Sequence, residues 1–551
     1  MKKYILSITL LFTFFISLHA QSTKEGLKAI DFERYEFARD NFKQVIMQEP
    51  KKGDNYYYLG QSYINLLQTD SALLAYNLGI IAEPINTKNY IGIGEILLNE
   101  NKVPEAKGYF EKALAISRGK DGRSTDAITL AMVASAMVSG ETKLLDDALT
   151  NINEALELNK KNYDILVMAG DVMLERNEGG PSATFFEKAI DLDKNNPKAY
   201  ARVAGIWLRV KNAEATLTAL TKALAIDSNY APALKSMAEY YYQIRKYEKA
   251  KETYIKYLKN SEESNANKIR FAQILFNTKE YEEALKKIEE IQKTDKNNVY
   301  LFRMAGYSCY EVAEAKKDTS KYRLGISSME TFFEKIDPKK IISSDYEYYG
   351  KLLSRVAGRE NDALLNFGKV LGMDSSKIEI YPEMGRINNK LKKFNEAAAN
   401  FEYYLSKNKN PNTTVYYLMS LGRSLYFGKQ YGRADTAFMK VNDLKPDYAE
   451  AFLFRGHSNA ALETDTKEGK AKEFYEKYIA LAEPAADKNK PGLLIAYDYL
   501  ATFYVKRDDK KLDDINSAKS FYNKILALDP ENKTAKENIK LLTQQKAAPK
   551  K

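Results

Sequence analysis

The chain has 551 residues, and its 44% hydrophobic and 12% aromatic content excludes a largely disordered protein. Its formal net charge of +10 is too small for this length to indicate nucleic-acid binding by itself. With two histidines and one cysteine, it lacks the parts of a His/Cys metal cluster and of most His-based or Cys-based catalytic sites, so we expect no enzyme activity and no cofactor.

The N-terminus "MKKYILSITLLFTFFISLHAQS" has the layout of a secretory signal peptide. Lys2 and Lys3 precede an apolar run, and the small residue Ala20 follows it. The alternative, an uncleaved membrane anchor, is disfavoured because the run is shorter than the ~20 residues that a spanning helix needs. We therefore expect residues 1–20 to be removed from an exported protein of the periplasm or cell envelope, with no transmembrane span after cleavage.

Small residues recur along the rest of the chain at a spacing close to 34 residues. The positions are Gly26, Gly60, Gly94, Gly170, Ala204, Ala238, Ala272, Gly306, Gly350, Gly385, Gly422, Gly456 and Ala501. A glycine inside a helix costs about 1 kcal/mol relative to alanine, so its repetition at one position implies a repeated gain. We interpret this gain as close approach to a small residue of a paired helix, such as Ala72 or Ala106.

The residues around Gly60 predict two helices joined by a turn. Steps of three, one and three residues place four side chains on one helix face: Tyr56, Leu59, Gly60 and Tyr63. Ala72 and Tyr76 lie on the face of a second helix, which Pro84 ends. On this interpretation Tyr56 and Tyr63 belong to the core, and Tyr57 points elsewhere.

This pattern resembles the tetratricopeptide repeat, a helix-turn-helix unit of 34 residues. The stretches "YYYLGQSY…SALLAYNLGIIAEP" and "LMSLGRSLYFGKQYGRADTAFMKVNDLKP" carry it most fully. The resemblance extends from Ser22 to Pro530, about fourteen units. It implies an all-α fold, a right-handed α-solenoid with a concave groove that binds peptides or partner proteins.

Breaks in the period suggest how the chain is organised. We divide it into N-terminal units at 21–297, C-terminal units with inserted loops at 298–530, and a capping helix with a flexible tail at 531–551. Eight extra residues near "SRGKDGRST" predict a bend before the fourth unit. Three later insertions fall between the two helices of a unit, and we interpret them as solvated loops or helix extensions, with a docking edge as the alternative.

The resemblance also indicates which residues line the groove, namely those one position after each recurrent small residue. This stripe is acidic or neutral in the first half of the chain and basic in the second. With neighbouring positions it gives the candidate partner-binding residues Arg303, Tyr307, Tyr310, Lys351, Arg386, Arg423, Tyr426 and His457. Such side chains could hold an acidic peptide, a C-terminal carboxylate or an anionic glycan, although lysine and arginine are common throughout this chain. The family's carboxylate-clamp asparagine is absent from this position.

Two functions follow from these observations. The first is a non-catalytic protein–protein interaction scaffold of the bacterial cell envelope, which binds a protein or peptide, such as another envelope protein, in its groove. The second is a carbohydrate-binding or small-ligand-binding protein, for which Tyr57, Tyr242, Tyr307 and Tyr310 should gather on the concave face. We interpret Cys309, the only cysteine, as a buried small apolar residue.

Overall fold

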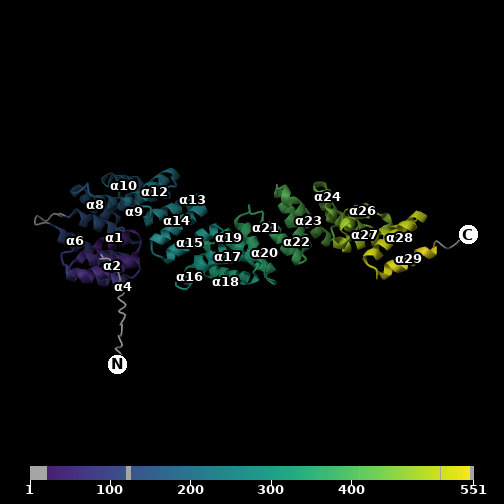
Figure 1. The fold of residues 1–551 in the computed structure, drawn as a ribbon, viewed down its shortest axis with the longest axis horizontal. Coiled ribbons are helices and arrows are strands. Elements are labelled where there is room, and N and C mark those ends of the chain that lie inside the picture. The colour runs from purple at the N-terminus through teal and green to yellow at the C-terminus, as the bar shows by residue number, and fades with distance from the viewer. Residues whose placement is uncertain (1–21, 119–125, 409, 509–510, 546–551) are drawn as a thin grey trace, which may run out of the picture. The chain divides into compact units, whose positions relative to one another are not determined.

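The structure, a computed structural model, describes residues 22–118, 126–408, 410–508 and 511–545. The regular elements in these ranges are helices (Figure 1). The predicted signal peptide and most of the insertion before the fourth unit lie outside the described residues. Contacts between helices divide the chain into two compact units, which we call unit 1 (residues 1–297) and unit 2 (residues 298–551).

Unit 1 contains sixteen helices. They are α1 (Thr23–Asp31), α2 (Tyr35–Gln48), α3 (Gly53–Asn65), α4 (Thr69–Ala82), α5 (Thr87–Asn99), α6 (Val103–Ser117), α7 (Ala127–Ala136), α8 (Leu145–Leu158), α9 (Tyr163–Glu175), α10 (Gly179–Leu192), α11 (Pro197–Arg209), α12 (Ala213–Ile226), α13 (Ala231–Gln243), α14 (Tyr247–Asn260), α15 (Asn265–Asn277) and α16 (Tyr281–Gln292), counted over the described residues.

Unit 2 contains thirteen α-helices and three short 3₁₀ turns in its described part. They are α17 (Val299–Lys316), α18 (Thr319–Lys335), η1 (Pro338–Lys340), α19 (Ser343–Ser354), α20 (Glu360–Met373), α21 (Ile380–Lys390), α22 (Phe394–Lys407), α23 (Pro411–Phe427), α24 (Tyr431–Leu444), α25 (Ala449–Ala461), η2 (Thr466–Glu468), α26 (Lys472–Ala482), η3 (Glu483–Ala485), α27 (Ala486–Lys506), α28 (Leu512–Leu528) and α29 (Lys533–Gln545).

The helices form fourteen pairs, and α29 follows the last pair. Each odd-numbered helix from α1 to α27 packs on the even-numbered helix after it. Odd-numbered helices also contact the next odd-numbered helix, as α3 does with α5 and α11 with α13, so the first helices of successive pairs form a continuous layer. The prediction of an all-α solenoid of about fourteen repeats is confirmed.

Local sequence sets many of the helix starts. A side-chain oxygen of the residue before the helix accepts a hydrogen bond from a backbone N–H of the first turn, which would otherwise be unsatisfied. Such caps are provided by Ser22, Asp126, Asn162, Asn196, Asn212, Ser264, Asn298 and Asp318.

The recurrent glycines meet a large side chain of the paired helix, which corrects our expectation of a contact between two small residues. A Cβ atom placed at Gly60 would overlap the ring of Tyr76, and one placed at Gly94 would lie 2.6 Å from Cε1 of Phe110. Tyr76 lies one helical turn after Ala72, the small residue that we had expected at this contact. The repeated glycine therefore provides the flat seat on which an aromatic ring packs.

The prediction that Tyr57 points away from the core is wrong. Its ring centroid lies 6.0 Å from that of Tyr76, and its side chain packs against the buried cluster that contains Ala72 and Ile93. The ring is large enough to reach the next helix pair from a position beside the predicted core face.

The first of the three later insertions lengthens helices. The helices α17 and α18 have 18 and 17 residues and are separated by two residues, whereas α3 and α4 have 13 and 14. The second insertion contains η2, and residues 509–510 of the third lie outside the described part. Of the two simple interpretations, helix extension therefore applies to the first insertion.

Unit 1 closes on itself through the turn between α1 and α2. This turn contacts residues that lie 199 to 226 positions further along the chain, and Figure 1 shows α1 and α2 beside the teal helices of the same unit. The ring of Phe32 meets that of Tyr230 edge-on at 5.5 Å. The carboxylate of Glu33 accepts a hydrogen bond from the Tyr257 hydroxyl at 2.5 Å.

Backbone groups complete this contact, which we call the clasp. The N–H of Glu262 donates to the carbonyl oxygen of Glu33 at 3.2 Å. In return, the carboxylate of Glu262 accepts from the N–H groups of Glu36 and Phe37 at 2.5 and 2.8 Å. The residue before α2, Arg34, provides no side-chain cap, so a residue from the seventh pair caps the second helix of the first.

Candidate functional site

Two of the predicted groove residues in unit 2, Arg303 and Tyr307, bind one buried carboxylate. Nε and Nη2 of Arg303 donate to the two oxygens of Asp345, each at 2.7 Å. The Tyr307 hydroxyl donates to Oδ1 of the same carboxylate at 2.7 Å. The side chain of Asp345 is fully buried, so this cluster joins α17 to α19 and neutralises the charge of Arg303.

Tyr310 and Lys351 lie beside this cluster, around the ring of Tyr348. Tyr348 stacks on Tyr307 with ring centroids 4.0 Å apart and meets Tyr310 edge-on at 5.8 Å. Nζ of Lys351 lies 5.4 Å from the centre of the Tyr348 ring and pairs with Glu347 at 2.6 Å. These four predicted residues are therefore brought together by the structure.

Tyr426 and His457 form a second cluster in unit 2. Their ring centroids lie 6.1 Å apart, and Nδ1 of His457 is hydrogen-bonded to the Tyr475 hydroxyl at 2.8 Å. Burial lowers the pKa of His457 below its ordinary value because the charged imidazolium is poorly solvated there. The imidazole is therefore a neutral hydrogen-bonding group near neutral pH.

The remaining predicted cations, Arg386 and Arg423, also lie beside acids. Arg386 pairs with Glu383 and Arg423 with Glu450. Each of the four predicted cations thus has a carboxylate partner, and the stripe is closer to charge balance than its own residues suggest. The sequence did not show this because the acids come from other positions. A binding role for these eight residues stays a prediction.

The tyrosines on which the carbohydrate hypothesis depends do not gather in one place. Tyr57 packs with Tyr76 in the first pairs of unit 1, and Tyr242 lies under the guanidinium of Arg270 at 3.8 Å. Tyr307 and Tyr310 share Tyr348 in unit 2 instead. This arrangement does not support a single tyrosine-lined sugar site.

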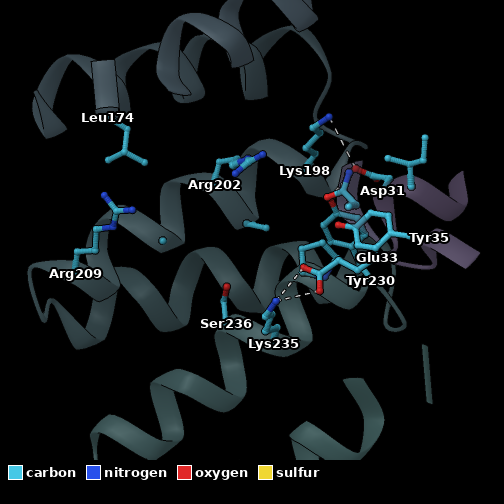
Figure 2. Close-up of a pocket in the computed structure, with 15 residues that line it drawn as sticks. Asp31, Glu33, Tyr35, Leu174, Lys198, Arg202, Arg209, Tyr230, Lys235 and Ser236 are labelled. Atoms are coloured by element: carbon cyan, nitrogen blue, oxygen red, sulfur yellow. Dashed lines mark hydrogen bonds and ion pairs between the residues drawn. The ribbon is translucent and has the colours of Figure 1, made fainter. Parts of the chain in front are cut away.

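A pocket of about 440 Å³ lies inside unit 1 beneath the clasp. Figure 2 shows side chains from α1, α9, α11 and α13 around it. It is lined by Ile30, Asp31, Glu33, Tyr35, Asn65, Leu174, Lys198, Ala201, Arg202, Gly205, Arg209, Tyr230, Pro232, Lys235 and Ser236. Because most of these residues come from odd-numbered helices, those helices face the inside of the unit, as expected for the groove.

Gly205 opens this pocket. No atom lies within 4 Å of a Cβ atom placed on it. In the neighbouring pairs the same position carries an acid, Asp171 or Glu239. Each of these acids pairs with an arginine, Asp171 with Arg202 and Glu239 with Arg270. Gly205 therefore removes both a side chain and a negative charge from the stripe.

The charges around the pocket are unequally paired. Lys235 lies 3.0 Å from Glu33, and Lys198 lies 3.9 Å from Asp31. Arg209, one turn after Gly205, forms no ion pair or side-chain hydrogen bond with any residue that the structure describes. The pocket thus presents an uncompensated guanidinium, the group best suited to a carboxylate.

Sequence reasoning placed Gly205 on the stripe but missed the pocket, because it compared charges and not volumes. The available signal was a glycine between two acidic neighbours at 34-residue spacing, with Arg202 and Arg209 three and four residues away on the same helix face. The clasp that covers the pocket had no local signal.

Other kinds of site are not found in the described ranges. No group of three His, Cys, Asp or Glu side chains there could hold a metal ion. Cys309 is buried, as predicted. Among the helices described, none has the length and apolar character to cross a membrane.

Comparisons with known proteins give three similar solved structures. The C-terminal part of a TPR repeat-containing protein from Cytophaga hutchinsonii is 31% identical, over 49% of this chain and 99% of that one, with a TM-score of 0.40. PilF from Pseudomonas aeruginosa is 18% identical, over 38% of this chain and 90% of PilF, with a TM-score of 0.30. YrrB, a TPR protein described as having an unusual peptide-binding site, is 20% identical, over 35% and 95%, with a TM-score of 0.22. No family model and no curated protein matches the chain.

Proposed function

The chain belongs to the tetratricopeptide repeat family, and from this premise we propose that it is a non-catalytic scaffold that holds a protein or peptide partner in its groove. Folds of this family are interaction scaffolds, which bind through surface detail that differs between members. The N-terminal sequence of residues 1–20 supports a place in the cell envelope, where the partner would be another envelope protein.

The pocket at Gly205 carries this proposal, because it combines free space with an unpaired charge. An acidic side chain of the partner that enters beside Gly205 would meet the guanidinium of Arg209, and its stem would contact the apolar wall formed by Leu174 and Pro232. Such a carboxylate would take the place that Asp171 and Glu239 occupy in the neighbouring pairs.

The experiment is affinity capture from the native envelope fraction with the chain from residue 21, in which Gly205 is varied. Gly205→Glu supplies the missing carboxylate from within the chain and should abolish capture of an acidic partner. Gly205→Gln adds nearly the same volume without the charge and should weaken capture less. Gly108→Glu is the control, since Gly108 on α6 also has open space around it.

The predicted residues of unit 2 are tested in parallel with Arg386→Glu combined with Arg423→Glu. Loss of a defined partner with this double variant alone would move the site to unit 2. A partner retained by every variant would exclude the groove, and the absence of any reproducible protein would overturn the scaffold proposal.

A further inference from the structure

A second cavity of unit 1, of about 800 Å³, lies on the opposite side of α11 from the pocket at Gly205. Tyr200, Val203 and Trp207 of α11 line it, together with residues of α10 and α12. Because successive helical residues turn by about 100°, Trp207 lies some 200° around the helix from Gly205. The cavity is therefore separate from the inner groove and opens between two even-numbered helices.

The cavity exists because α12 is small where neighbouring helices are large. Ala215 and Ala219 of α12 line it. Thirty-four residues before Ala219, the equivalent position of α10 is Phe185, whose ring packs against the apolar core. Ala219 lacks such a ring, so the space beside Trp207 stays open.

The aromatic lining of this cavity has no partner of its own. Trp207 is the only tryptophan of the chain and is half-buried. Among the residues described, neither a cation nor a second aromatic ring stacks on its indole. Tyr200, also half-buried, lines the same space. An indole face that borders an open cavity is the strongest of the aromatic cation acceptors.

The rim of the cavity carries carboxylates that are also unpaired. Glu187, Asp191 and Glu214 are exposed, and none forms an ion pair within the described part of the chain. Lys194 and Lys222 also border the cavity. The rim therefore has three negative and two positive groups, a net charge of −1, and neither lysine lies over the indole.

We propose that this cavity binds a basic side chain, arginine or lysine, of a partner protein. The cation would lie against the face of Trp207, and its N–H groups would donate to the carboxylates of Asp191 and Glu214. Arginine suits the site better than lysine, because its planar guanidinium stacks on an aromatic ring and still donates in the ring plane. This inference does not depend on the proposed binding at Gly205, which lies on the other face of α11 and selects the opposite charge.

The single tryptophan makes a direct assay possible, because the fluorescence of the chain from residue 21 comes from Trp207 alone. The probe is a short glycine-serine peptide that contains two arginines, and its control has glutamine at both positions. We expect a saturable change in fluorescence with the arginine peptide, weakened by added salt, and no change with the glutamine peptide.

Variants test whether the signal arises in the cavity. Ala219→Phe, which restores the residue of the preceding pair, should abolish the change. Asp191→Asn should weaken binding by about tenfold, the loss expected for one charge-assisted hydrogen bond. Glu157→Gln is the matched control, since Glu157 is an exposed acid 34 residues before Asp191 and does not line the cavity. Asp191→Asn lies on the surface and keeps the test valid should Ala219→Phe disturb folding.

Three results would overturn the proposal. One is a fluorescence change that survives in Ala219→Phe. Another is an equal response to free arginine, which would indicate a small-molecule site instead of a protein contact. The third is a response to a neutral oligosaccharide and not to the arginine peptide, which would indicate a sugar site.

Discussion

The clasp predicts that residues more than 200 positions apart stabilise unit 1 cooperatively. Tyr257→Phe removes the hydroxyl that donates to Glu33 at 2.5 Å and leaves the packing of the ring unchanged. A hydrogen bond to a charged group contributes about 1.5–3 kcal/mol. Glu33→Gln weakens the same bond and also the ion pair with Lys235, whose partly exposed groups add at most about 1 kcal/mol. We therefore expect each variant to open the clasp more often by roughly 2 kcal/mol, about thirtyfold.

The assay is hydrogen exchange at the amides of Glu36 and Phe37, which the carboxylate of Glu262 holds only while the clasp is closed. Both single variants should accelerate exchange there, and the double variant should add little, since both remove one interaction. Tyr254→Phe is the control, because its hydroxyl donates to the Asn267 carbonyl at 3.2 Å without touching the clasp. Strictly additive effects, or unchanged exchange in the single variants, would refute the closure of unit 1.

Two further predictions concern the packing of the pairs. Gly60→Ala should destabilise the chain, because the overlap with Tyr76 costs about 1–3 kcal/mol and offsets the gain in helix propensity, whereas Gly108→Ala, in open space, should stabilise it by about 1 kcal/mol; denaturant melts measure both, and equal effects would contradict the role of the glycine as a ring seat. Burial lowers the pKa of His457 from its ordinary 6.5, so its contribution to stability is complete above that pH and is lost as the pH falls toward the lowered pKa. His457→Gln should therefore flatten the pH dependence of thermal unfolding between about pH 7.5 and 5.5, and an unchanged slope would exclude this cause.

The repeat architecture could be predicted from the sequence because it depends on contacts between residues close in the chain. Gly60 and Tyr76 are sixteen residues apart, and the same contact recurs in most pairs, so the period itself records it. The charge of the groove could be predicted less well. Arg303 and Asp345 are 42 residues apart, and Asp345 does not lie on the stripe, so the neutralising partner was not visible from the position that the period indicates.

The clasp had no sequence signal of any kind, because it depends on the rotation accumulated over six helix pairs. A small change in the packing angle of each pair would carry Phe32 away from Tyr230, although every local pattern would stay the same. Long-range closure in a repeat protein is therefore a property of the sum of its interfaces, which no single repeat contains.

The two cavities of unit 1 show a different limit of sequence reading. A repeat array places an equivalent side chain at the same position of every pair, so a cavity opens where one pair carries a smaller residue than its neighbours. Gly205 does so between Asp171 and Glu239, and Ala219 does so one period after Phe185. The repeated residues of this chain build the fold, and the exceptions to the repeat open its binding sites. Restoring the residue of the neighbouring pair, as in Gly205→Glu and Ala219→Phe, is therefore the substitution that closes each site while respecting the architecture.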